Sequence, residues 1–201
     1  MPRRAAKGIF CLEGDWWGDL NKSSTVKPVL KLLSQTPERR VPFIHRDVGT
    51  REELRYYLRK WAQHGRAGYP ILYLAFHGES ECILVGDLRN PKKSKVTLDE
   101  LAEDLGSKLT GRIVHFSSCE TLKTDKRNIL RFLRKTGLVA TTGFQKEVDW
   151  LKSAAFEVLM FDAMLRRRFT AHGAHLIERD LRTEAKALAD EHGFRLITRD
   201  Q

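Results

Sequence analysis

The feature that most constrains the fold is a near-continuous apolar run, YPILYLAF, at residues 69–76. Such a run, rich in residues that favour β-structure, is typical of a central strand of a parallel sheet that is covered on both faces. A second run of this kind, GRIVHFSS, follows at residues 111–118. The two runs predict two buried strands of an α/β fold.

Strand patterns and helix patterns alternate along the rest of the chain, which predicts a parallel sheet with helices on both faces. Thr50 and Thr97 are expected to begin helices, because Glu53 and Glu100 stand at the capping-box position three residues later. Gly65 and Gly137 are expected to end helices. Strands are expected at 8–12, 41–47, 69–76, 111–118 and 138–144, helices at 26–33, 49–65, 97–109, 125–137, 148–169 and 176–193, a hairpin arm at 81–87 and a possible edge strand at 194–198.

Length and composition suit one domain. The 201 residues, of which 41% are hydrophobic, are enough for a single α/β domain spanning 1–201 with a substantial core. No apolar run approaches the roughly 18 residues of a membrane helix, so no membrane partner is expected. The basic start MPRRAAK is followed by only five apolar residues, too few for the core of a signal peptide, and a cytoplasmic location is expected.

The cysteines indicate neither disulfides nor a metal site. There are three, Cys11, Cys82 and Cys119, and none belongs to a C-x-x-C motif. His115 and Cys119 form the only closely spaced Cys/His pair, and two ligands do not make a zinc site. We expect no metal and no organic cofactor, and we expect Cys11 and Cys82 to be chemically inert.

The net charge of +10 permits binding to nucleic acid or to an acidic protein. Basic residues gather at 91–95, 123–135 and 165–169. No nucleic-acid-binding motif accompanies them, so solvated helix faces and a solvated loop are the favoured interpretation. A nucleic-acid partner is possible but not favoured.

Candidate reactive residues follow two of the predicted strands. In an open α/β sheet, ligands bind outside the carboxyl ends of the strands. His77 and Gly78 come directly after the run at 69–76, and Cys119 follows the run at 111–118. If these strands are neighbours, the imidazole can raise the thiolate fraction of Cys119, as in cysteine nucleophiles. The backbone N–H groups of Gly78 and Cys119 could then form an oxyanion hole.

Each residue also has a purely structural interpretation. Cys119 taken alone is more often a small buried apolar residue, and His77 alone is more often a hydrogen-bonded loop histidine. His115 is expected to be a satisfied strand residue rather than a ligand. Spacing alone leaves these alternatives open.

A family resemblance joins the two strand ends. The segments LAFHGESECILVGD, VTLDELAEDL, GRIVHFSSCET and LVATTGFQKEVDWLKSAAFEVLMFDAML, within roughly residues 70–169, together resemble the CHAT branch of the caspase-like cysteine peptidases. The resemblance implies a caspase–haemoglobinase-like α/β fold, with a mostly parallel sheet and helices on both faces. It also implies a cysteine endopeptidase with His77 as base and Cys119 as nucleophile.

The same resemblance implies a biological setting. CHAT peptidases are often effectors in bacterial defence or programmed death, and a partner module releases them from an inactive state. A protein substrate and a separate sensor or activator protein are therefore expected. Ser117 stands where caspases have Gln and metacaspases have Asp, so neither specificity carries over. The chain also lacks the tetratricopeptide repeats that many CHAT proteins carry.

Several residues are candidates for substrate binding. Glu13 and Asp15 follow the first strand, close to where this fold places its primary specificity pocket, and either could pair with Arg or Lys at the cleavage position. The alternative is that they are loop carboxylates, or that Asp15 caps a turn. Asp149 is a further candidate, with a helix N-cap as its favoured alternative. Ser117 leaves the preference open.

Two rival functions stay open. The fold could serve as an inactive module that binds nucleic acid or an acidic protein through its basic helices. It could also be a cysteine hydrolase that acts on a non-peptide amide.

Overall fold

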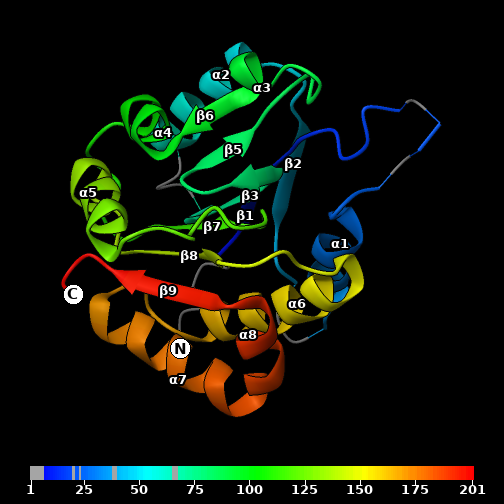
Figure 1. Ribbon diagram of the computed structural model, residues 1–201. Helices are drawn as coiled ribbons and strands as arrows, with labels where there is room; N and C mark the ends of the chain where they lie inside the picture. The colour runs from blue at the N-terminus through cyan, green and yellow to red at the C-terminus, as the bar shows by residue number, and fades with distance from the viewer. Residues whose placement is uncertain (1–6, 20, 23, 38–39, 65–67) are drawn as a thin grey trace.

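A central six-stranded sheet forms the core of the protein in the computed structural model, which describes residues 7–201 apart from 20, 23, 38–39 and 65–67 (Figure 1). Its strand order is β2-β1-β3-β7-β8-β9, and every pair is parallel except β8 with β9. This confirms the mostly parallel α/β sheet. The strands are β1 Ile9–Glu13, β2 Phe43–Asp47, β3 Ile71–Ala75, β7 Ile113–Phe116, β8 Ala140–Phe144 and β9 Phe194–Thr198.

Helices cover both faces of the sheet, and each face has its own apolar core (Figure 1). Along β3, Tyr73 belongs to one core and its neighbours Leu72 and Leu74 belong to the other, as the alternation of side chains in a strand requires. The helices of the Tyr73 face are α1 Lys27–Gln35, α6 Trp150–Arg166, α7 Ala171–Glu184 and α8 Lys186–His192, and those of the Leu72 face are α2 Arg51–His64, α4 Leu98–Leu105 and α5 Lys126–Thr136.

The expected capping boxes are confirmed. In α4 the Glu100 amide donates to Thr97 Oγ1 at 3.2 Å, and the Thr97 amide donates to the Glu100 carboxylate at 2.8 Å. Thr50 and Glu53 exchange the same two bonds before α2, at 3.2 and 3.1 Å. Gly137 ends α5 in the left-handed conformation, at φ 76°. The stop expected at Gly65 lies outside the described residues.

A small antiparallel sheet was only partly expected. It consists of β4 His77–Glu79, β5 Cys82–Leu84 and β6 Lys95–Thr97, in the order β4-β5-β6, with the short helix α3 Pro91–Ser94 between its last two strands. The hairpin arm predicted at 81–87 corresponds to β5. His77, expected directly after the run at 69–76, is the first residue of β4.

The helix expected at 176–193 is instead two helices. The chain turns at Ala185, with φ −140° and ψ 30°, where the Ala185 amide still donates to Leu181 O at 2.8 Å and closes α7. The edge strand at 194–198 is confirmed as β9. None of the helices in the described part of the chain has the length and apolar character needed to cross a bilayer.

Candidate active site

The register of two central strands places His77 and Cys119 together. Leu74 of β3 pairs with Phe116 of β7, and the Ser117 amide continues the pairing by donating to Leu74 O at 2.9 Å. His77 lies three residues beyond Leu74, and Cys119 lies three residues beyond Phe116. Both side chains line one cavity of about 370 Å³. The predicted convergence of the two strand ends is therefore present in the structure.

Gly78 packs directly against the loop that carries Cys119. A Cβ atom at position 78 would lie 2.3 Å from Thr121 Oγ1 and 2.7 Å from both Cys119 O and Ser118 Cβ. No side chain fits at such distances, so the site requires glycine here for close approach of two backbones. The oxyanion role of the Gly78 and Cys119 amides stays a prediction.

Hydroxyl groups hold the Cys119 loop onto the small sheet. Ser118 Oγ lies 2.6 Å from Thr121 Oγ1, which donates to the carbonyl oxygen of Cys82 at 3.0 Å. The next residue after the cysteine, Glu120, has a positive φ of 56°, so the chain turns sharply behind the thiol. The serine and threonine that flank Cys119 therefore fix the loop.

The imidazole of His77 is oriented by Trp16, in the loop after β1. His77 Nε2 lies 2.6 Å from the carbonyl oxygen of Trp16, and the two rings meet edge to face with centroids 5.3 Å apart. A carbonyl oxygen can only accept a hydrogen bond, so Nε2 carries the hydrogen. In the neutral ring, Nδ1 is then the basic nitrogen.

Glu13 anchors Trp16 from below. Its carboxylate accepts the Trp16 indole N–H at 2.7 Å and the Val26 amide at 2.7 Å through Oε1, while Oε2 contacts Thr25 Oγ1 at 2.7 Å and His45 Nε2 at 2.5 Å. Burial raises the pKa of Glu13, but the hydrogen bonds from His45, Thr25, Trp16 and Val26 outweigh it, so the net pKa is lowered. The structure thus places Glu13 beneath Trp16, outside the residues that line the His77–Cys119 cavity.

The other two carboxylates proposed for the specificity pocket also bind local backbone. Asp15 Oδ1 accepts the amides of Trp17 and Gly18 at 3.0 and 3.2 Å, which forms a turn. Asp149 caps α6 by accepting the Lys152 amide at 2.9 Å. Neither lines the cavity. These contacts agree with the capping alternatives, and substrate binding by Asp15 or Asp149 stays a prediction.

The thiol of Cys119 is half-buried and starts from its protonated form. Burial raises its pKa above the ordinary value, and the nearby charges of Glu147 and Glu120 raise it further. A hydrogen bond from the Val148 backbone acts in the opposite direction. Among the described residues no hydrogen bond joins this thiol to the His77 ring; in resting enzymes such contacts are often loose. The role of His77 and Cys119 as base and nucleophile stays a prediction.

A buried polar cluster, Tyr73–Ser117–His115–Glu157, lies beside the cavity. Glu157 of α6 accepts the Tyr73 hydroxyl at 2.5 Å and contacts His115 Nε2 at 3.1 Å. Tyr73 also reaches Ser117 Oγ at 3.5 Å, and Ser117 and Glu157 both line the cavity. Burial, then the charge of Glu157, raises the pKa of Tyr73 well above its ordinary value, so the phenol stays protonated and donates.

Sequence reasoning missed Glu157, although it leaves a signal. It is an isolated acid inside the apolar stretch AAFEVLMF of the long helix. His115, which contacts Glu157 through Nε2, has hydrogen-bond partners for both ring nitrogens, as expected for a strand residue. Its Nδ1 lies 2.9 Å from Thr142 Oγ1. Cys11 and Cys82 are buried, and burial raises the pKa of both thiols.

One group of side chains in the described residues could surround a metal ion. Ligand atoms of Glu13, His45 and Asp47 all lie within 4.8 Å of one another. However, both oxygens of Glu13 already have two hydrogen-bond partners each. The contacts with Trp16 and Thr25 satisfy this carboxylate without an ion.

Comparison with known proteins supports the fold. A model of a family of unknown function, DUF6642, matches residues 6–197. Among solved structures, the chain is similar to caspase-1 from Spodoptera frugiperda, with 10% identity and a TM-score of 0.52 over 96% of this chain and 87% of that chain. No curated protein matches the chain. The caspase-like fold is therefore shown, and the CHAT assignment stays a resemblance.

Proposed function

The chain belongs to DUF6642, a family of unknown function. We propose that it is a cysteine endopeptidase of the caspase-like type that cleaves a partner protein. One observation carries the proposal: His77 and Cys119, at the ends of adjacent strands of a caspase-like sheet, line the same cavity. The hydrogen bond that fixes the His77 ring supports it.

The proposed reaction follows from the positions of these groups. Cys119 Sγ attacks the scissile carbonyl carbon while His77 Nδ1 takes the thiol proton, and the new oxyanion is held by the Gly78 and Cys119 amides. The Trp16 carbonyl stabilises the imidazolium through Nε2–H. His77 gives its proton to the amine as the C–N bond breaks. Water then attacks the thioester, His77 takes its proton, and the carboxylic acid and free thiol are released.

The test uses a panel of peptidyl ketones with a leaving group, which trap a catalytic cysteine without knowledge of the natural substrate. We expect intact-protein mass spectrometry to show one adduct, on Cys119, in wild type and in Cys82→Ala. Cys119→Ala should take no adduct, and His77→Ala should label at least a hundredfold more slowly. Wild-type protein that no probe labels, or equal labelling of His77→Ala, would contradict the proposal.

The biological role is proposed on the CHAT resemblance alone. The peptidase would be an effector of a bacterial defence or programmed-death system, in the cytoplasm, switched on by a separate sensor protein. Co-expression with its natural neighbours, followed by detection of a cleaved partner that disappears in Cys119→Ala, tests this role.

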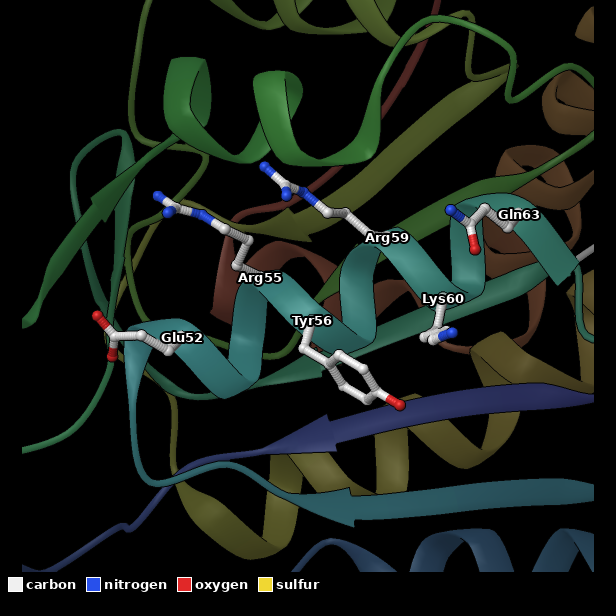
Figure 2. A pocket seen from close by; sticks show the side chains of 6 residues that line it. All are labelled: Glu52, Arg55, Tyr56, Arg59, Lys60 and Gln63. Carbon is white, nitrogen blue, oxygen red and sulfur yellow. The ribbon is translucent and has the colours of Figure 1, made fainter.

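The rival nucleic-acid function rests on the net positive charge, although some basic side chains of α2 and α5 already form ion pairs with acids of α4. Figure 2 shows Arg55 and Arg59 on one side of α2 and Tyr56 on the other. Both arginines pair with Asp104 of α4, at 3.1 and 3.2 Å, and Lys135 of α5 pairs with Asp99 of α4 at 2.7 Å. Basic residues of α2 and α5 thus form ion pairs with acidic residues of α4. Nucleic-acid affinity that falls steeply with salt and survives in Cys119→Ala would favour the rival.

A further inference from the structure

The cavity that contains the proposed dyad has a mostly apolar lining. Among the described residues that line it there is one carboxylate, Glu157, and there is no lysine or arginine. Much of the remaining wall is apolar. The apolar lining residues include Trp16, Trp150 and Leu151.

Helix α6 links the mouth of the cavity to Glu157. Leu151 and Trp150, at the start of the helix, are 76% and 41% exposed, whereas Glu157 is 1% exposed. Ala154 lines the cavity between them. Seven residues of α-helix rise roughly 10 Å, so the carboxylate lies about that far below the rim along the helix. A short side chain that enters at the rim does not reach it.

The carboxylate of Glu157, which lines the cavity, has two hydrogen-bond contacts with neighbouring side chains. Glu157 takes one bond from Tyr73 on Oε2 and contacts His115 on Oε1. A carboxylate has about four acceptor positions, so roughly two remain for a guest. Tyr73 and His115 fix the direction of the carboxylate, since their rings are buried and stack at 5.6 Å.

We infer that this cavity binds the side chain on the amino side of the scissile bond, and that Glu157 selects one with a long apolar stem and a cationic end, as in arginine or lysine. The inference rests on the proposed function. Trp16 and Trp150, with ring centroids 4.8 Å apart, offer an aromatic wall to the stem. A guest side chain that ends in a carboxylate would meet the charge of Glu157, and a purely apolar side chain would bring no hydrogen-bond donor to its remaining acceptor positions.

The acid that would select the substrate therefore lies on helix α6 rather than in the segments before it. The sequence pointed to Glu13, Asp15 and Asp149, which are occupied by local bonds. Ser117, two residues before Cys119, belongs to the same buried cluster as Glu157 and also lines the cavity, where its side chain is small.

The first experiment compares peptidyl ketones that differ only in the residue next to the ketone: Arg, Lys, Leu or Asp. We expect Arg or Lys to label wild type about ten- to a hundredfold faster than Leu, as for a charge-assisted bond in a buried site, and Asp to label slowest. Glu157→Gln should remove the preference for Arg, whereas Asp162→Asn, on the same helix but outside the cavity, should keep it. Faster labelling by Leu or Asp in wild type overturns the inference while the peptidase proposal stands.

The second experiment does not depend on catalysis. Butylguanidine and its neutral analogue butylurea are compared as protectants of Cys119 against iodoacetamide. We expect butylguanidine alone to slow alkylation, and Glu157→Gln to lose the protection. Equal protection by both compounds, or by neither, overturns the inference even if peptidyl ketones fail to label the protein. The comparisons between ligands on wild-type protein test the inference without the variant. The inference can therefore still be tested if Glu157→Gln does not fold.

Discussion

His77 Nε2 lies 2.6 Å from the carbonyl oxygen of Trp16, a residue 61 positions earlier in the chain. The indole of Trp16 is in turn held by the buried carboxylate of Glu13, at 2.7 Å. A first-strand acid, a loop tryptophan and the candidate base thus form one connected chain. The orientation of the His77 ring depends on the charge state and position of Glu13.

Glu13→Gln should therefore lower the reactivity of Cys119, although Glu13 contacts neither His77 nor Cys119 directly. The amide nitrogen of Gln cannot accept a bond, so contacts to two of Trp16, Thr25, Val26 and His45 are lost or reversed. We expect Cys119 labelling by a peptidyl ketone to slow about tenfold or more, and the unfolding free energy to fall by about 1–3 kcal/mol. The pH dependence of labelling should also shift, because Nε2–H loses its fixed acceptor. Asp15→Asn, in the exposed turn nearby, is the control and should leave that pH dependence unchanged.

The same carboxylate makes a pH-dependent contribution to stability. The pKa of Glu13 in the folded protein is lowered from its ordinary value of 4.5. The stability gained from it is therefore fully present above about pH 4.5, and it is lost as the pH falls through the folded pKa. Urea unfolding from pH 6 downward should show a decline in wild type that is shallower in Glu13→Gln. Parallel curves for the two proteins would refute this assignment.

Gly78→Ala should disable the site through the backbone. The added methyl would meet Thr121 Oγ1, Cys119 O and Ser118 Cβ, all within 2.7 Å, so β4 and the Cys119 loop must separate. We expect a loss of about 1–3 kcal/mol in unfolding free energy and no measurable labelling of Cys119 in the protein that still folds. Gly49→Ala is the matched control, since the nearest atom to its Cβ would be 3.6 Å away. Normal labelling of Gly78→Ala would show that the close approach is dispensable.

The reactivity of Cys119 should respond to a single nearby charge. Burial first, then the charges of Glu147 and Glu120, raise the thiol pKa above its ordinary value of 9.0. Removing a negative charge stabilises the thiolate, so Glu147→Gln should lower this pKa and increase alkylation by neutral iodoacetamide at pH 7.5. Alkylation rates measured by mass spectrometry from pH 6 to 10 give the pKa of Cys119 in wild type and in Glu147→Gln. Glu103→Gln, an exposed acid on α4, should leave the curve where it is in wild type.

Local sequence patterns predict the sheet and most of its helices, because the signals involved are local. The apolar run through Leu74 and the capping boxes at Thr50 and Thr97 need no knowledge of tertiary structure. The three-residue strands of the small sheet are too short to show a period, so β4 and β6 were not expected. The turn at Ala185 contains neither Gly nor Pro, which are the usual signals of a helix end.

The candidate pair could be predicted from the sequence, but its surroundings could not. His77 and Cys119 follow apolar runs, and their strand ends meet because β3 and β7 are adjacent. The contact between Trp16 and His77, and the approach of Glu157 to the cavity, join segments separated by 61 and 38 or more positions. Such contacts depend on how α6 and the β1 loop pack, for which a single sequence contains no pairing signal. The sequence therefore points to Glu13 and Asp15 as specificity residues and not to Glu157 inside an apolar helix.

The small sheet also connects the two candidate reactive side chains, His77 and Cys119. It begins with His77, and through the carbonyl of Cys82 it holds Thr121 of the Cys119 loop. His77 and the Cys119 loop are therefore both attached to the small sheet. Movement of this sheet would carry both groups, whereas a distortion between β4 and β5 would change their spacing. Changes in the outer helices α7 and α8 should alter stability and leave that spacing intact.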